Sequence, residues 1–345
     1  MRTIAPSPSE RQVFISFARG LSIFTIILYH FLQRARLPPP LAQASLLGGS
    51  GIYIFLFASS YGLYFSRATT WGSFYFKRFK RILLPYYIGV TLIVLINYFV
   101  GIYPNSWQAY LSHLLLYKMF CEQYISSYGL QFWFISTIIQ FYLLWPLFLL
   151  ASKHVSNSKL LLISFGISLL YSVLIVRLDL QHQRIWHSSV IQYTWVFALG
   201  LIAAKEQCLP RLLQLGGFRY GLFLIAGIVL ALLISKLAGG GGSPFNDYFM
   251  FIAYFSANIL LYLLGQKLPF IIRFVLWIES FSYSLYIVHL FILFLYLKVL
   301  SEARLNLYEV PAVTALCIGV ALLFDRLIQL VTNARLGRPR PVLGV

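Results

Sequence analysis

Ten apolar segments of the chain are long enough, or nearly long enough, to cross a lipid bilayer as helices. A spanning helix needs about 20 mostly apolar residues. The ten segments are residues 14–33, 48–66, 82–101, 131–151, 159–177, 190–204, 219–237, 247–265, 281–301 and 308–330. A further apolar stretch, 107–120, contains His113 and Lys118, so we expect it to be interfacial or re-entrant, with an eleventh span as the alternative. The segments predict an all-α integral membrane protein, a bundle of about ten transmembrane helices.

Composition excludes the soluble classes. The 345 residues are 60% hydrophobic and only 10% charged, whereas soluble globular proteins carry about 25% charged residues. The net charge of +18 would suggest nucleic acid in a soluble protein. Here the basic residues lie mostly between apolar segments, as in cytoplasmic loops, so we expect no nucleic-acid partner. The three cysteines are far apart, which predicts neither a disulfide framework nor a metal site.

The distribution of basic residues predicts the orientation. With ten spans both termini lie on one side, and eighteen of the 27 Lys and Arg residues fall in the loops of that side, against eight on the other. The positive-inside rule therefore places both termini in the cytoplasm. Every loop is too short for a soluble catalytic domain. We expect a single transmembrane domain over residues 1–333 and a basic cytoplasmic tail over 334–345 that contacts anionic lipid.

The first span contains the sharpest candidate pair, Arg19 and His30. Eleven residues are close to three helical turns, so both side chains lie on one face, about 16 Å apart along the axis. Arg19 could hold a phosphate or pyrophosphate, and His30 could act as a general base. The alternative is that Arg19 snorkels to the interface while His30 hydrogen-bonds a neighbouring helix.

A second candidate is a basic cluster with four cations in five residues, namely Lys77, Arg78, Lys80 and Arg81. Such a cluster at a cytoplasmic membrane boundary could bind the phosphates of a nucleotide-like molecule such as coenzyme A. The alternative is a topogenic cluster on anionic lipid, worth about 1 kcal/mol per cation.

Two later spans contain further polar side chains. His289 lies about two turns into the ninth span, as a second intramembrane polar group or a packing histidine, and Glu279 precedes that span at the expected interface. The fourth span contains Trp133, Ser136 and Tyr142. Ser136 lacks the Gly-x-Ser-x-Gly context of a serine hydrolase. The chain also has no P-loop, dinucleotide fingerprint or HExxH motif.

Taken together, these features resemble the integral-membrane O-acyltransferases of the acyltransferase-3 family. Five motifs in order carry the resemblance: Arg19 and His30 in the first span, the aromatic-rich run 51–62, the basic cluster 77–81 followed by Pro85-Tyr86-Tyr87, the run 133–146, and Ser282 to His289. The resemblance covers residues 12–330. It departs at Ile138 and Ile139, where many members carry a glutamate, and at Ser60, where many have glycine.

The resemblance implies transfer of an acyl group from acyl-CoA to a hydroxyl of a glycan or glycolipid of the cell envelope. Acetyl-CoA is the donor that it favours, and the bacterial inner membrane is the expected location. It makes Arg19 and His30 the catalytic pair and Arg78 and Arg81 donor contacts, with the other basic-cluster residues beside them. Residues of the two late motifs are its candidates for substrate binding: Trp133, Ser136, Tyr142, Tyr283 and His289.

Two other functional classes fit the same residues. Ten helices with sparse intramembrane charge also suit a transporter or flippase for a glycolipid or small polar solute, although no repeat pairing is visible. A non-catalytic membrane scaffold is the second alternative, and it predicts that replacing Arg19 or His30 has no phenotype.

Overall fold

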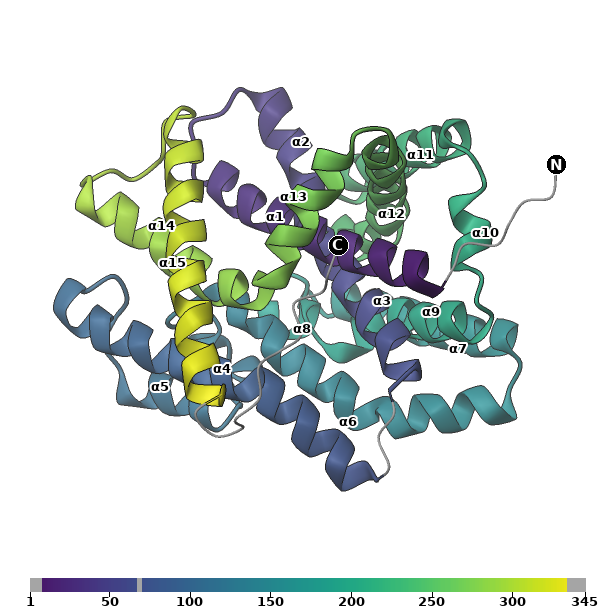
Figure 1. Ribbon diagram of the computed structural model, residues 1–345, viewed down its shortest axis with the longest axis horizontal. Coiled ribbons are helices and arrows are strands. Elements are labelled where there is room, and N and C mark those ends of the chain that lie inside the picture. The colour runs from purple at the N-terminus through teal and green to yellow at the C-terminus, as the bar shows by residue number, and fades with distance from the viewer. Residues whose placement is uncertain (1–7, 67–69, 334–345) are drawn as a thin grey trace.

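The computed structural model describes residues 8–66 and 70–333, and within these ranges the chain is built from helices (Figure 1). The α-helices are α1 (Pro8–Gln33), α2 (Pro39–Gly49), α3 (Gly51–Tyr64), α4 (Trp71–Val100), α5 (Trp107–Leu114), α6 (Trp133–His154), α7 (Asn157–Arg177), α8 (Arg184–His187), α9 (Thr194–Lys205), α10 (Leu209–Leu213), α11 (Gly217–Ala238), α12 (Ser243–Lys267), α13 (Pro269–Ser280), α14 (Ser282–Val299) and α15 (Glu309–Asn333). The 3-10 turns are η1 (Lys118–Phe120), η2 (Glu122–Tyr124), η3 (Leu130–Phe132), η4 (Val190–Tyr193) and η5 (Gly239–Gly242). The predicted all-α membrane bundle is confirmed, while the tail at 334–345 lies outside the described residues.

The candidate membrane spans agree with the prediction of about ten. Nine stretches of the described residues are long and apolar enough to cross a bilayer. One of them, Gly217–Lys267, has 51 residues and contains two helices, α11 and α12, which pack against each other with η5 between them. A single span needs only about 20 residues. This stretch therefore accounts for two of the predicted spans.

Two predicted segments have different boundaries in the structure. The segment expected at 48–66 corresponds to α3, which the short helix α2 precedes with Ser50 between them, so that the candidate span begins earlier, at Leu41. The segment expected at 82–101 begins at Trp71, where the Thr70 side chain caps α4 by accepting a hydrogen bond from the backbone N–H of Ser73 (3.2 Å). Residues 77–81 therefore lie inside a helix, whereas the predicted span begins only at residue 82 and leaves them outside it.

Two shorter elements lie between the spans. The stretch expected to be interfacial or re-entrant, 107–120, forms only the eight-residue α5 and the turn η1, and it is not a candidate span. Helix α13 is not among the predicted spans, and it packs closely on α1. A Cβ on Gly20 would lie 2.3 Å from the backbone oxygen of Val275. Only glycine allows this approach, which brings Glu279 of α13 toward Arg19 of α1.

Helix α1 connects the two halves of the core. In Figure 1 it runs through the middle of the bundle, in contact with α2, α3, α13 and α14. Phe14 and Phe17 belong to a buried cluster that also includes side chains of α3, α6, α9 and α12. Ile27 and Phe31 belong to a second cluster with side chains of α4, α14 and α15. The face of α1 between these clusters is left for polar groups.

Candidate functional site

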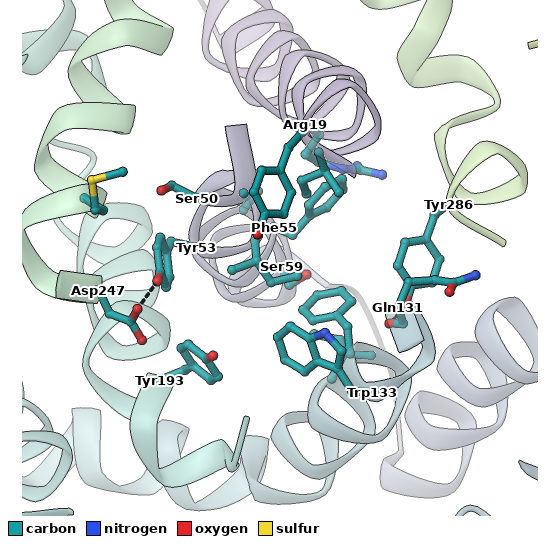
Figure 2. A pocket seen from close by; sticks show the side chains of 18 of the residues that line it. Arg19, Ser50, Tyr53, Phe55, Ser59, Gln131, Trp133, Tyr193, Asp247 and Tyr286 are labelled. Carbon is teal, nitrogen blue, oxygen red and sulfur yellow. Dashed lines mark hydrogen bonds between the residues drawn. The ribbon is translucent and has the colours of Figure 1, made fainter. Parts of the chain in front are cut away.

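A cavity of about 1040 Å³ lies inside the bundle. Side chains of α1, α2, α3, α4, α6, α11, α12 and α14 contribute to its wall, and Figure 2 shows part of that lining around an open centre. Ligand sites in proteins typically measure about 300–1,000 Å³. The cavity is therefore large enough for an extended molecule or for two substrates at once.

Arg19 and His30 both line this cavity, from positions eleven residues apart on α1. Because that spacing is about three turns, one face of the helix presents a cation near one end of the cavity and an imidazole farther along it. Arg19 also forms an ion pair that the sequence analysis did not anticipate, with its Nη2 3.1 Å from Oε1 of Glu279. Both side chains of the pair remain partly exposed, so Arg19 keeps a face toward the cavity.

Only two of the four basic side chains of the cluster on α4 face the cavity. Arg78 and Arg81 line the cavity, whereas Lys77 and Lys80 do not. Arg78 donates a hydrogen bond from Nη2 to Oγ of Ser66 (3.1 Å) and lies over the ring of Phe74. The division follows from the helix, since positions three apart share a face and adjacent positions do not. The structure thus brings three of the predicted arginines to the cavity: Arg19, Arg78 and Arg81.

His289 lies directly behind His30. The two rings are 5.3 Å apart between centroids, and His289 is fully buried outside the cavity lining. Its Nδ1 donates to the backbone oxygen of Tyr286 (2.7 Å), because a carbonyl oxygen can only accept. That hydrogen bond leaves the Nε2 lone pair free, and Nε2 has no hydrogen-bond partner among the described residues. An unsatisfied buried acceptor next to His30 suits a residue that orients the His30 ring.

Some of the remaining predicted residues line the cavity and others do not. Trp133, Tyr142 and Tyr283 line the cavity, and the Tyr283 hydroxyl donates to the backbone oxygen of Ile82 (2.8 Å). Ser136 is buried but is not part of the lining. Of the two isoleucines at which the sequence departs from the expected family pattern, Ile138 lines the cavity and Ile139 is buried. The α6 wall is therefore apolar at this position.

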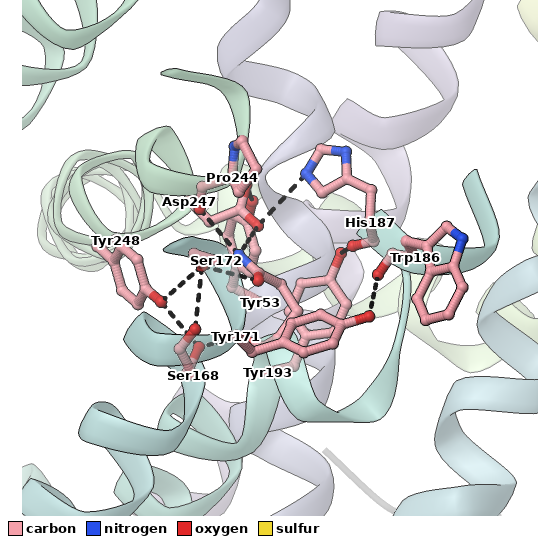
Figure 3. A network of polar contacts seen from close by, with 11 residues as sticks. Tyr53, Ser168, Tyr171, Ser172, Trp186, His187, Tyr193, Pro244, Asp247 and Tyr248 are labelled. Carbon is pink, nitrogen blue, oxygen red and sulfur yellow. Dashed lines mark hydrogen bonds and ion pairs between the residues drawn. The ribbon is translucent and has the colours of Figure 1, made fainter. Parts of the chain in front are cut away.

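The structure supplies a carboxylate from another helix, Asp247 of α12, which the sequence analysis missed. Asp247 is buried, and it is the only acidic side chain among the described residues that line the cavity. Its carboxylate accepts hydrogen bonds from the Tyr53 hydroxyl and from Nε2 of Gln192, the latter at 3.3 Å. His187, a second missed cavity residue, has its Nε2 3.8 Å from Oδ2 of Asp247 (Figure 3).

A polar network holds this carboxylate in place. The Gln192 amide also donates to the backbone oxygen of Pro244 (2.8 Å) and accepts from the Ser172 hydroxyl (2.9 Å). Ser172 and Ser168 both hydrogen-bond the Tyr248 hydroxyl, as Figure 3 shows. A signal for this site exists in the sequence, because acidic residues inside spans are rare and functional. It was overlooked because the predicted span begins at Asp247, whereas α12 begins four residues earlier.

The cavity therefore contains three kinds of functional group. Three arginines can bind phosphate groups, the His30 imidazole can accept a proton, and a polar wall around Asp247 can hydrogen-bond hydroxyl groups. This arrangement suits transfer of a group from a phosphorylated carrier to a hydroxylated acceptor.

Comparison with known proteins yields one match. Residues 12–326 match the family model of the acyltransferase-3 proteins, which is described as an acyltransferase domain. No curated protein and no solved structure matches the chain.

Proposed function

Because the chain belongs to the acyltransferase-3 family and is an integral membrane acyl-transfer enzyme, we propose that it moves an acyl group from acyl-CoA to a hydroxyl of a glycan or glycolipid. The observation that carries the proposal is the single cavity lined by Arg19, Arg78, Arg81 and His30. The acyl group is acetyl, the whole of residues 1–333 forms one catalytic domain, and the membrane is the bacterial inner membrane. Both termini lie in the cytoplasm, where coenzyme A thioesters are available.

The three arginines bind the phosphate groups of the donor. Guanidinium groups form bidentate, charge-assisted hydrogen bonds to phosphate. Arg19 is available to the donor only in part, because it also contacts Glu279. Arg78 and Arg81 have no ion-pair partner among the described carboxylates, so their charge is free for phosphate. With the phosphates there, the thioester arm extends along α1 toward His30.

His30 then acts as the general base. A ring nitrogen of His30 takes the proton of the acceptor hydroxyl while that oxygen attacks the thioester carbonyl carbon. The carbon–sulfur bond breaks, and the departing thiolate of coenzyme A takes the same proton from the imidazolium. The products are an O-acyl ester and free coenzyme A. His289 is a positioning residue in this scheme, because its free Nε2 can accept a hydrogen bond from the His30 ring.

A transfer assay separates this function from a transporter. Purified protein in lipid nanodiscs is supplied with acetyl-CoA labelled in the acetyl group and with a mixture of envelope glycans and glycolipids. We expect the label to appear on the acceptor with release of an equal amount of coenzyme A, and mass spectrometry identifies the acylated species. Movement of a glycolipid across proteoliposomes without thioester consumption would instead identify a transporter.

Neutralising the two cavity-facing arginines of α4 should weaken donor binding. For the double variant R78Q/R81Q we expect the Kd of acetyl-CoA to rise by at least about 100-fold, because two charge-assisted hydrogen bonds are lost, each contributing about 1.5–3 kcal/mol, and about 1.4 kcal/mol corresponds to a tenfold change. Isothermal titration in nanodiscs measures the change. The matched control is K77Q/K80Q, which removes the same charge from the same helix but outside the cavity lining. Equal losses in both double variants would mean that overall charge, and not the cavity, binds the donor.

A further inference from the structure

Arg184 is a cation in the cavity wall that the proposed mechanism does not use. It begins the short helix α8, and its side chain lines the cavity with those of His187 and Asp247. Its guanidinium carbon lies over the Trp133 ring, 4.4 Å from the ring centroid, in cation–π contact. His187, one helical turn away, is the residue that reaches Asp247. Arg184 therefore belongs to the part of the cavity that holds the polar network.

The guanidinium of Arg184 has no anionic partner in the described part of the chain. Its Nε is buried without a hydrogen-bond partner, and no described carboxylate lies within ion-pair distance. Glu122 is nearby, but its two oxygens accept from the backbone N–H groups of Arg184 and Ile185, each at 3.1 Å. Glu122 thus fixes the turn that carries Arg184 and leaves the side-chain charge uncompensated.

Asp247 forms no ion pair with Arg184 either. Its carboxylate contacts the Tyr53 hydroxyl, the Gln192 amide and His187, and it keeps lone pairs for a sugar hydroxyl. Four arginines and a single carboxylate line the cavity within the described residues. An unpaired charge inside a membrane protein is costly and marks a binding site. The arginines on α1 and α4 already account for the donor phosphates in the proposed function, so Arg184 requires a second anion.

We propose that Arg184 binds an anionic group, a carboxylate or a phosphate, on the sugar that accepts the acyl group. The inference rests on the proposed acyl transfer and narrows its acceptor to an acidic glycan unit. Around the anion, Asp247 and Tyr53 supply hydrogen-bonding groups for the sugar hydroxyls, and His30 lies in the same cavity to activate one of them. A neutral sugar would leave the Arg184 charge unpaired and would bind less tightly.

The test compares three methyl β-glucosides that differ only at carbon 6: methyl β-glucuronide, methyl β-glucoside 6-phosphate and methyl β-glucoside. Binding is measured by isothermal titration in nanodiscs without donor, and transfer is measured with labelled acetyl-CoA. We expect the wild-type protein to bind one of the anionic sugars at least about 10-fold more tightly than the neutral one. The anionic sugar that is preferred distinguishes a carboxylate site from a phosphate site.

R184Q should remove the preference, and R184K should retain part of it. The matched control is R177Q, which removes an exposed charge outside the cavity lining and should keep the preference.

Several results would overturn the assignment. One is the absence of Arg184-dependent binding of either anionic sugar. A second is a loss of acetyl-CoA affinity in R184Q, which would assign the residue to the donor. A third is an equal fall in kcat for all three sugars with the preference retained, which would make Arg184 a group that stabilises the reacting oxyanion. Anion binding without any acetyl transfer would contradict the proposed enzyme function and leave the anion site intact.

Discussion

Replacing His30 by alanine is expected to lower the rate of acyl transfer by about 10²–10⁴-fold, the usual contribution of a positioned general base. The Kd of acetyl-CoA should change little, because the phosphate-binding arginines are three helical turns away on α1 or lie on α4. Steady-state transfer kinetics and isothermal titration on the same nanodisc preparation measure the two quantities. A lost rate with retained donor binding is the signature of a base.

The control for this variant is His182→Ala. His182 is an exposed histidine that does not line the cavity, so its removal changes the same residue type without affecting the site. Thermal unfolding of both variants shows whether the His30 substitution is tolerated by the fold. Wild-type transfer rates in His30→Ala protein would eliminate His30 as the base and would also remove the proposed role of His289, since that role acts through His30.

Replacing Gly200 by valine is expected to disrupt the packing of α9 on α3. A Cβ at this position would lie 2.3 Å from the backbone oxygen of Phe57 and 3.0 Å from its carbonyl carbon. Backbone atoms of a packed helix cannot move aside as a flexible side chain can, so the two helices must separate. Overpacking typically costs about 1–3 kcal/mol, and we expect at least that loss here. Helix α3 carries Tyr53 and Ser59 into the cavity, so activity should fall with stability.

Thermal unfolding in detergent and the yield of monodisperse protein measure this effect. The matched control is Gly166→Val in α7, because a Cβ at Gly166 meets no atom within 4 Å. The two substitutions introduce the same side chain into apolar helices, and only the distance to the neighbouring backbone differs. Equal unfolding temperatures for the two variants would contradict the close approach of α3 and α9.

The number and approximate positions of the membrane-spanning helices could be predicted from the sequence, because the bilayer restricts which structures can cross it. A polypeptide in hydrocarbon must satisfy its backbone hydrogen bonds within each segment, so a run of apolar residues becomes a helix wherever the chain folds. Lengths and approximate positions of the spans follow directly from this requirement. Helix ends do not, because their positions depend on local contacts. The Thr70 cap starts α4 eleven residues before the predicted span, and that extension places the basic cluster on a helix.

The candidate site could be predicted only in part, because contacts between different helices do not follow from the spacing of residues along the chain. Arg19 and His30 lie on one helix, so their common face follows from the helical repeat alone. The ion pair of Arg19 with Glu279 joins two helices 260 residues apart in the chain, and no spacing predicts it. Asp247 falls at the start of a predicted span and Arg184 in the connection between two predicted spans, and charged residues are unremarkable at both kinds of position.

The amino-acid sequence by itself determined the membrane class, the approximate number of spans, the family resemblance and the pairing of Arg19 with His30, because each depends on composition, order or the period of a single helix. The tertiary structure alone decided which cations face the cavity, that His289 lies behind His30, and that Asp247 provides the carboxylate of the cavity wall. Those relations depend on how separate helices rotate and approach one another, and such packing is set by close contacts between small residues and backbone atoms that a linear pattern does not encode.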